Sequence, residues 1–134
     1  MTLTNSTANQ NIMMKIVIND TRKISDIQDE FHKSYPYLKL VFFSEPHKPQ
    51  CETSKILMIN SNRTVGECRT KHNEGVIEIV PFMSVTKLEQ YFNTIFGLGV
   101  QVFRQSGKAW LETTVTDSWT LEEQNKQGEE LSKQ

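Results

Sequence analysis

The sequence has few of the features that mark a secreted, membrane-bound or disulfide-stabilised protein. Only 2 of its 134 residues are cysteine, which is too few for a disulfide framework. No apolar run approaches the roughly 20 residues that a membrane-spanning helix needs. Residues 1–12 lack the basic start and the apolar stretch of a signal peptide. We therefore predict a cytoplasmic protein that does not cross a membrane.

An excess of one charge is also missing, because 15 Lys and Arg residues face 16 Asp and Glu residues, for a net charge of -1. The chain therefore has no electrostatic reason to bind nucleic acid or an anionic membrane. Hydrophobic residues make up 37% of the chain, enough for a core. We expect a flexible tail over residues 1–12, a single α+β domain over 13–118, and a polar helix or frayed tail over 119–134.

Apolar periodicity and turn residues predict alternating strands and helices. Strands are expected over residues 15–19, 38–43, 56–59, 76–80, 100–104 and 109–115. Helices are expected from four capping boxes, namely Ser25 with Gln28, Thr64 with Glu67, Thr86 with Glu89, and Thr120 with Glu123. The second helix ends before Gly75, and the last two strands form a hairpin through residues 105–108. The last helix has few aliphatic residues and contains Gly128, so we expect it to be solvated and to fray.

Seven positions of the first half recur 61 residues later. Ile16, Ile18, Ile24, Ser25, Ile27, Gln28 and Phe31 correspond to Ile77, Ile79, Val85, Thr86, Leu88, Glu89 and Phe92. Each copy predicts a β-α-β unit, whose two strands lie parallel in one sheet. We therefore predict a mixed, ferredoxin-like sheet of about six strands with helices mainly on one face. Any two β-α-β units share apolar spacing, so the pattern leaves open whether the repeat is a duplication.

The stretch GLGVQVFRQSGKAWLETTVTDSWTLEEQN, residues 97–125, resembles a segment of a family of small uncharacterised bacterial proteins. The resemblance extends back to about residue 15 and includes LKLVFFSEPHK, residues 38–48. It implies a bacterial protein with a single domain. That family has no known activity, cofactor or catalytic residue, so the resemblance assigns no functional residue to this chain.

Two pairs of His and Cys residues are of the types that zinc prefers. Cys68 and His72 lie four positions apart on a predicted helix, where both side chains would share one face. His47 and Cys51 lie in the Pro-containing segment before it, which could fold over that helix. Against a zinc site, the order of the four residues is not that of a familiar zinc finger. A buried Cys68 and three surface residues explain the same pattern, so zinc is an alternative and no other cofactor is expected.

The C-terminal hairpin carries the residue types most typical of a protein interface. Arg104, Lys108 and Trp110 lie on it and Trp119 follows it. Trp and Arg are favoured at interface centres, and an exposed hairpin can pair with another chain, although packing in an ordinary core is the simpler explanation of the Trp residues. No catalytic set is recognisable. The leading hypothesis is a non-catalytic module that binds a protein partner or a second copy through this hairpin. A zinc-binding protein and an enzyme of unrecognised type are the alternatives.

Overall fold

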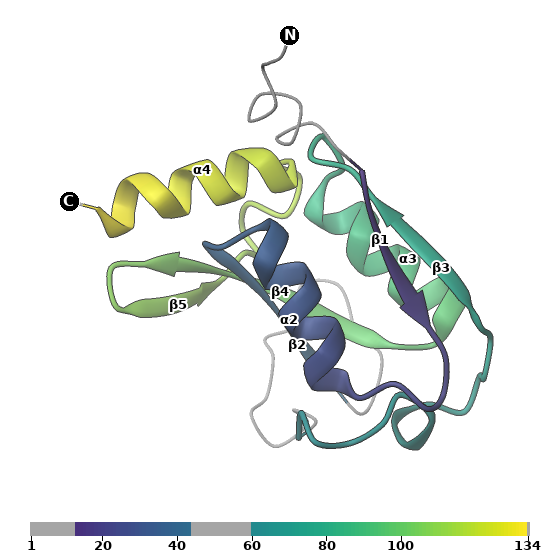
Figure 1. Cartoon of the computed structure of the whole chain (residues 1–134). Helices are drawn as coiled ribbons and strands as arrows, with labels where there is room; N and C mark the ends of the chain where they lie inside the picture. Colours follow the sequence, from purple (N-terminus) through teal and green to yellow (C-terminus); the bar gives the residue numbers. More distant parts are fainter. Residues whose placement is uncertain (1–12, 44–59, 134) are drawn as a thin grey trace, which may run out of the picture.

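A computed structural model of the chain describes residues 13–43 and 60–133, which form an α+β fold (Figure 1). The first half consists of β1 (Met14–Ile18), α2 (Ile24–Ser34) and β2 (Leu38–Phe43), followed by the short 3-10 helix η2 (Gly66–Cys68). The second half consists of β3 (Gly75–Ile79), α3 (Val85–Phe96), β4 (Gly99–Ser106), β5 (Ala109–Glu112) and α4 (Leu121–Ser132). The predicted fold class, α+β, is confirmed. The strand predicted at 56–59 lies outside the described residues.

The described strands form two antiparallel sheets instead of the single mixed sheet that the sequence predicts. β1 pairs with β3, and the second sheet has the order β2-β4-β5. The expected parallel pairing within each half does not occur, because the two strands of each β-α-β segment lie in different sheets. The physical reason lies in β1 and β3, which alternate buried and exposed residues. That alternation suits an antiparallel sheet with one solvated face, whereas strands of a parallel sheet are buried on both faces.

The helices contact both sheets and are therefore not confined to one face. α2 contacts β1 and β2, α3 contacts β3 and β4, and α4 packs mainly on β4. Figure 1 shows α4 running alongside the β4–β5 hairpin, at the opposite side of the molecule from β1 and β3. The core is formed by fully buried side chains from both halves, including Ile16, Phe31, Phe42, Ile77 and Phe92. The Phe42 and Phe92 rings meet edge to face with centres 5.8 Å apart.

An approximate two-fold axis relates the two halves of the fold. Ile16 pairs with Ile77, the residue that occupies the same position 61 residues later. In the other sheet, Leu40 pairs with Val102 and Val41 pairs with Gln101. Gln101 and Val102 lie 61 residues after Leu40 and Val41, so each of these two pairs is the counterpart of the other. Pairing of equivalent positions with each other is what a two-fold axis produces. The registers of both strand ladders are therefore those that an approximate two-fold relation between the halves would produce.

Each half also closes the start of its helix with the same backbone hydrogen bonds. In the first half, the Ile24 N–H donates to the Arg63 carbonyl (2.9 Å) and the Val65 N–H donates to the Arg22 carbonyl (2.8 Å). In the second half, the corresponding bonds run from Val85 to Trp119 (3.0 Å) and from Leu121 to Met83 (2.9 Å). The same local backbone arrangement therefore carries Arg63 in one half and Trp119 in the other.

Two of the predicted capping boxes do not form because the helices begin earlier than expected. α2 begins after Lys23, which makes no side-chain cap. α3 begins after Ser84, whose hydroxyl accepts the N–H of Lys87 at 3.1 Å. The box of Thr120 and Glu123 is confirmed at the start of α4, where both reciprocal hydrogen bonds are present.

The helix expected from Thr64 to residue 74 is reduced to η2. Thr64 and Glu67 do form their reciprocal hydrogen bonds, but the chain leaves the helical conformation after Cys68. Residues 69–74, RTKHNE, contain no large apolar side chain that a continued helix could bury. Helical stability in proteins comes mainly from such burial, so a cap alone does not extend the helix.

Gly128 does not interrupt α4, which is continuous from Leu121 to Ser132. Gly128 is buried, and a Cβ atom at this position would lie 2.8 Å from the Cβ of Tyr37. The Tyr37 N–H donates to the side-chain oxygen of Asn125 at 2.9 Å. Because glycine has no side chain, α4 packs closely on the chain before β2 at this position.

Candidate functional site

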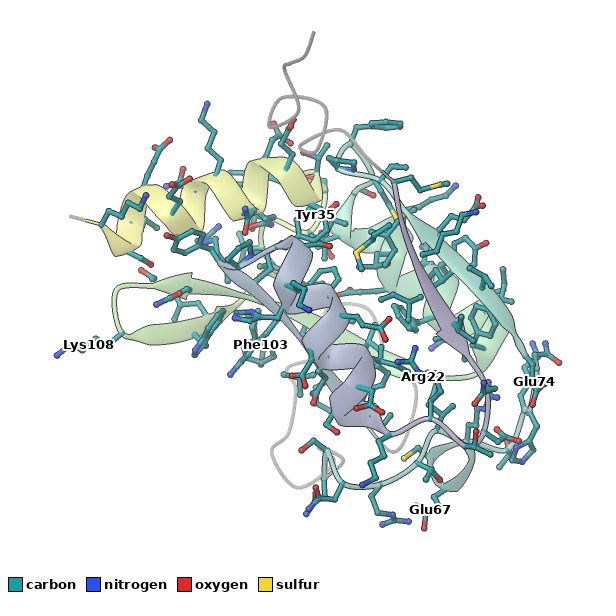
Figure 2. All side chains as sticks on the ribbon, viewed as in Figure 1. Arg22, Tyr35, Glu67, Glu74, Phe103 and Lys108 are labelled. Carbon is teal, nitrogen blue, oxygen red and sulfur yellow. The ribbon has the colours of Figure 1, made fainter. Side chains whose placement is uncertain are left out.

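The β4–β5 hairpin distributes the predicted interface residues over two faces. A two-residue turn, residues 107–108, joins the strands in place of the four-residue connection expected. Arg104 lies opposite Leu111, whereas Trp110 is paired one position further along β4. Successive side chains of a strand point to opposite faces, so Arg104 and Trp110 lie on different faces. Lys108 lies at the tip of the hairpin and points away from the body of the molecule (Figure 2).

Arg104 lies next to α4 and Trp119. Its Nη1 donates to the side-chain oxygen of Gln124 at 2.9 Å, and its Cζ lies 5.9 Å from the centre of a Trp119 ring. Its Nε is buried and has no hydrogen-bond partner among the described residues. Arg104 forms no ion pair within residues 13–43 and 60–133, whereas the other arginines each pair with a carboxylate, namely Arg22, Arg63 and Arg69. Arg104 is thus a partly buried cation without a counter-charge among the described residues.

Trp110 packs on the opposite face of the hairpin, against two cationic or titratable side chains. The Nζ of Lys39 lies 4.7 Å from the centre of the ring, and the His32 ring centre lies 6.0 Å away. Burial lowers the pKa of Lys39 from its usual value. A lysine over an indole ring is a stabilising contact of about 0.5–1 kcal/mol where it is partly exposed. Packing within the fold accounts for Trp110 and separates it from Arg104.

β5 is the outermost strand of its sheet. Gln105, which is paired with Trp110, donates its N–H to the carbonyl of Tyr37 at 2.9 Å, away from β5. Hydrogen-bonded and non-bonded pairs alternate in an antiparallel ladder, so the main-chain groups of Trp110 and Glu112 point to the outer edge. No other strand of the described part of the chain pairs with that edge. β5 therefore offers a free edge to an extended chain.

Trp119, whose ring lies beside Arg104, is one of several large apolar side chains that are exposed. Phe82 is 76% exposed, Val115 97% and Trp119 37%. The segments that carry Phe82 and Trp119 are joined by the backbone hydrogen bonds at the start of α3 and α4. Leu111, which shares the face of Arg104, is 45% exposed. We call Arg104, Leu111 and Trp119 the Arg104–Trp119 surface.

The structure gives Cys68 and His72 different partners. The Cys68 thiol donates to the Thr64 carbonyl at 3.1 Å, and the Nδ1 of His72 lies 2.8 Å from an Asp20 carboxylate oxygen. The shared helix face on which the zinc hypothesis depended is absent, because His72 lies beyond η2. The other two candidate ligands, His47 and Cys51, lie outside the described residues. Within the described residues, no group of three or more Cys, His, Asp or Glu side chains could hold a metal ion.

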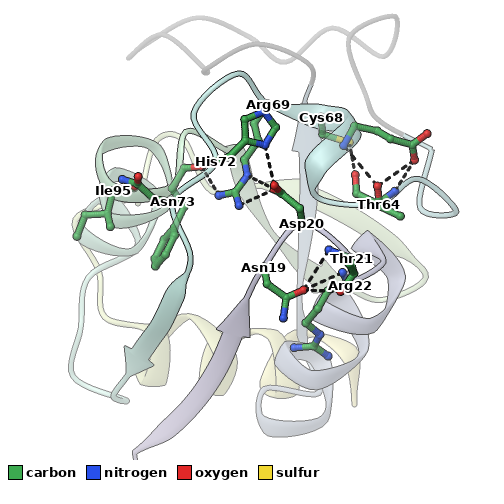
Figure 3. A network of polar contacts seen from close by, with 12 residues as sticks. Asn19, Asp20, Thr21, Arg22, Thr64, Cys68, Arg69, His72, Asn73 and Ile95 are labelled. Carbon is green, nitrogen blue, oxygen red and sulfur yellow. Dashed lines mark hydrogen bonds and ion pairs between the residues drawn. The ribbon is translucent and has the colours of Figure 1, made fainter.

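Asp20 is the centre of a polar cluster that local sequence patterns do not reveal (Figure 3). The fully buried side chain of Arg69 donates from Nε and Nη2 to one Asp20 oxygen, at 3.1 and 2.8 Å, and from Nη1 to the Phe96 carbonyl at 2.9 Å. His72 contacts the other Asp20 oxygen. The hydrogen bond from Arg69, with a smaller contribution from His72, holds the pKa of Asp20 below its usual range. The cluster joins the end of β1 to the end of α3 and has a structural role.

Replacing Arg69 with methionine is expected to lower the free energy of unfolding by about 2 kcal/mol, because the buried Phe96 carbonyl loses its hydrogen-bond donor. Methionine keeps much of the apolar stem in place. Urea unfolding followed by circular dichroism measures the change. The matched control is Arg63→Met, since Arg63 is exposed and its pair with Glu67 is worth little, so a change within about 0.5 kcal/mol is expected. Equal effects of the two substitutions would contradict the structural role of Arg69.

Glu89 is a second residue whose role the sequence misassigns. It was expected to cap α3 with Thr86, but its carboxylate accepts the N–H of Val102 at 3.0 Å. Val102 lies on β4 just past the point where β5 ends. The Glu89 carboxylate therefore takes the place of the main-chain carbonyl that a longer β5 would offer to the Val102 N–H. Burial raises the pKa of Glu89 to about 7, with small additional contributions from Asp117 and Glu112. A carboxyl group therefore titrates near neutral pH inside the fold.

The free edge of β5 and the Arg104–Trp119 surface are the described features best suited to contact another molecule. No helix in the described ranges has the length and apolar character needed to cross a bilayer. Comparison with known proteins found no matching family model, no matching curated protein and no matching solved structure.

Proposed function

We propose that the protein is a non-catalytic interaction module that binds another protein through its C-terminal hairpin. The observation that carries the proposal is the free edge of β5, where the main-chain groups of Trp110 and Glu112 point outward. An extended segment of a partner can join such an edge as a further strand. Main-chain hydrogen bonds then supply affinity, and the side chains beside the edge supply specificity.

Side chains bond the outer edges of β1 and β2, whereas no side chain of the described residues has a hydrogen bond to the outer edge of β5. At β1, the Nη1 of Arg22 donates to the Val17 carbonyl at 3.0 Å, and Glu30 pairs with Arg22. At β2, the side-chain amide of Gln28 donates to the Leu40 carbonyl at 2.9 Å. Proteins commonly protect strand edges with proline, lysine, bulges or covering groups. β5 has the sequence AWLE and carries no proline or lysine, which supports its use as a binding edge.

Photo-crosslinking from position 111 tests the proposal in the cells that produce the protein. A photoreactive phenylalanine analogue at Leu111 is expected to give a discrete product with a partner protein. The same analogue at Val17 is the matched control, because Val17 is 48% exposed on the other sheet and Leu111 is 45% exposed. The control is expected to give no product.

A second substitution shows whether the product depends on the strand edge. Glu112→Pro removes an outward N–H, and proline is tolerated on an edge strand, so the fold is expected to remain while the crosslink disappears. Glu112→Ala keeps the N–H and is expected to keep the crosslink. A product with twice the mass of the chain would identify the partner as a second copy of this protein. Absence of any product from position 111, or persistence in Glu112→Pro, would refute binding at this edge.

A further inference from the structure

We infer that Arg104 and Trp119 recognise a carboxylate on the partner segment that binds at β5. The inference rests on the proposed function, because it names the chemistry of the segment that joins the edge. Its first support is the electrostatic state of Arg104. The guanidinium group donates to the neutral amide of Gln124, while Nε is buried without a partner in the described part of the chain. A partly buried cation without a counter-charge is costly, and a carboxylate would reduce that cost.

The chemistry of the guanidinium group favours a carboxylate over other ligands. Arginine presents its N–H donors in a planar fork that matches the two oxygens of a carboxylate. The adjacent Trp119 ring contacts one side of this group and is 37% exposed. A ligand that pairs with Arg104 would therefore also cover part of an indole ring. Arg and Trp together are typical of the centre of a protein interface.

The first half of the chain shows that the fold does not require apolar residues at this surface. Thr21 and Arg63 occupy the backbone positions of Phe82 and Trp119, and the surrounding backbone hydrogen bonds correspond. Thr21 is exposed, and the Arg63 side chain is 54% exposed and pairs with Glu67. The same arrangement thus accepts polar side chains. Stability of the fold therefore does not require the exposed indole of Trp119, and contact with a partner would account for it.

The position of the surface beside β5 determines the kind of segment that fits. Alternate side chains of a strand added to β5 would lie on the face that carries Arg104 and Leu111. An extended segment with an Asp or Glu flanked by apolar residues would place its carboxylate toward Arg104 and its apolar groups toward Leu111 and Trp119. Lys108 at the nearby turn adds a second positive charge. The occupant is therefore an acidic, extended segment of another protein.

A library of random short peptides displayed on phage and selected on the full-length protein tests this inference. The selected peptides are expected to be enriched in Asp or Glu next to apolar residues. One selected peptide is then synthesised, and its binding is measured by isothermal titration calorimetry. Arg104→Gln is expected to weaken binding about tenfold or more, the size of a lost charge-assisted hydrogen bond. Arg63→Gln, at the counterpart of Trp119, is the control and is expected to leave binding unchanged.

A further variant does not depend on the contact between Arg104 and Gln124. Trp119→Arg introduces the residue that the first half carries at this position, so the circular dichroism spectrum is expected to remain unchanged while binding is lost. Selected peptides without acidic residues, or peptide binding that Arg104→Gln leaves unchanged, would overturn the carboxylate site. Glu112→Pro tests the strand edge separately from the carboxylate site. If peptides bind at β5, this variant is expected to abolish binding of every selected peptide.

Discussion

Replacing Glu89 with glutamine is expected to stabilise the protein by about 3 kcal/mol at about pH 8 and by less than about 1 kcal/mol near pH 5. Burial raises the pKa of Glu89 from 4.5 to about 7 in the folded protein. The folded state therefore binds a proton more tightly than the unfolded state. The resulting stability is present below pH 4.5 and is lost as the pH rises through 7. Glutamine stays neutral throughout and still offers an oxygen to the Val102 N–H.

Denaturant unfolding of both proteins at several pH values between 5 and 8 measures this effect. The difference between wild type and variant isolates Glu89, because every other group is the same in both proteins. Glu78→Gln is the control for the loss of one carboxylate, because Glu78 lies on the exposed face of β3. The first half already uses glutamine at the counterpart of Glu89, where Gln28 bonds a strand edge. Parallel pH profiles for wild type and Glu89→Gln would show that Glu89 does not titrate as inferred.

Replacing Gly128 with leucine is expected to lower the free energy of unfolding by about 3 kcal/mol. The first added atom would lie 2.8 Å from the Cβ of Tyr37 and 3.2 Å from its carbonyl oxygen, so α4 or the chain before β2 must move. Gly128→Ala is expected to have a smaller effect of the same sign, because alanine favours the helix by about 1 kcal/mol but introduces the same Cβ. Thermal and urea unfolding measure both changes.

Lys126→Leu provides the control for this prediction. Lys126 is exposed on the same helix, so leucine there tests the composition of α4 without steric conflict. It is expected to change stability by less than about 0.5 kcal/mol. A variant Gly128→Leu that is as stable as Lys126→Leu would mean that α4 does not pack closely on Tyr37. Since Arg104 also contacts this helix, displacement of α4 is expected to disturb the Arg104–Trp119 surface.

Local structure follows closely from the sequence, whereas the pairing of strands does not. The apolar positions of α3, such as Leu88 and Phe92, recur at helical spacing and are buried as that spacing predicts. Ile95 belongs to the same predicted face but is 41% exposed. The pairing of β1 with β3 joins residues about 60 positions apart, and apolar spacing specifies which face is buried but not which strand is the neighbour.

The contacts of the candidate site were likewise not predictable from local sequence patterns. The composition of the hairpin groups Arg104, Trp110 and Trp119 as interface candidates, but it does not show that Trp119 lies beside Arg104 and that Trp110 lies on the other face. Asp20 and Arg69 are 49 positions apart, and their hydrogen bond has no local signature. Glu89 fits a capping motif with Thr86, yet an unpaired strand N–H lies within its reach and forms the competing hydrogen bond. Tertiary partners override local motifs in both cases.

The two-fold arrangement has a consequence for how the chain folds during synthesis. The main strand partners of the first half belong to the second half, since β1 pairs with β3 and β2 pairs with β4. Long sequence separation between contacting strands slows folding, because much of the chain must be ordered before these contacts form. The first half leaves the ribosome before its partners exist, and its apolar strand faces remain uncovered until β4 has been synthesised. Folding is therefore expected to be a late and cooperative event in which neither half precedes the other.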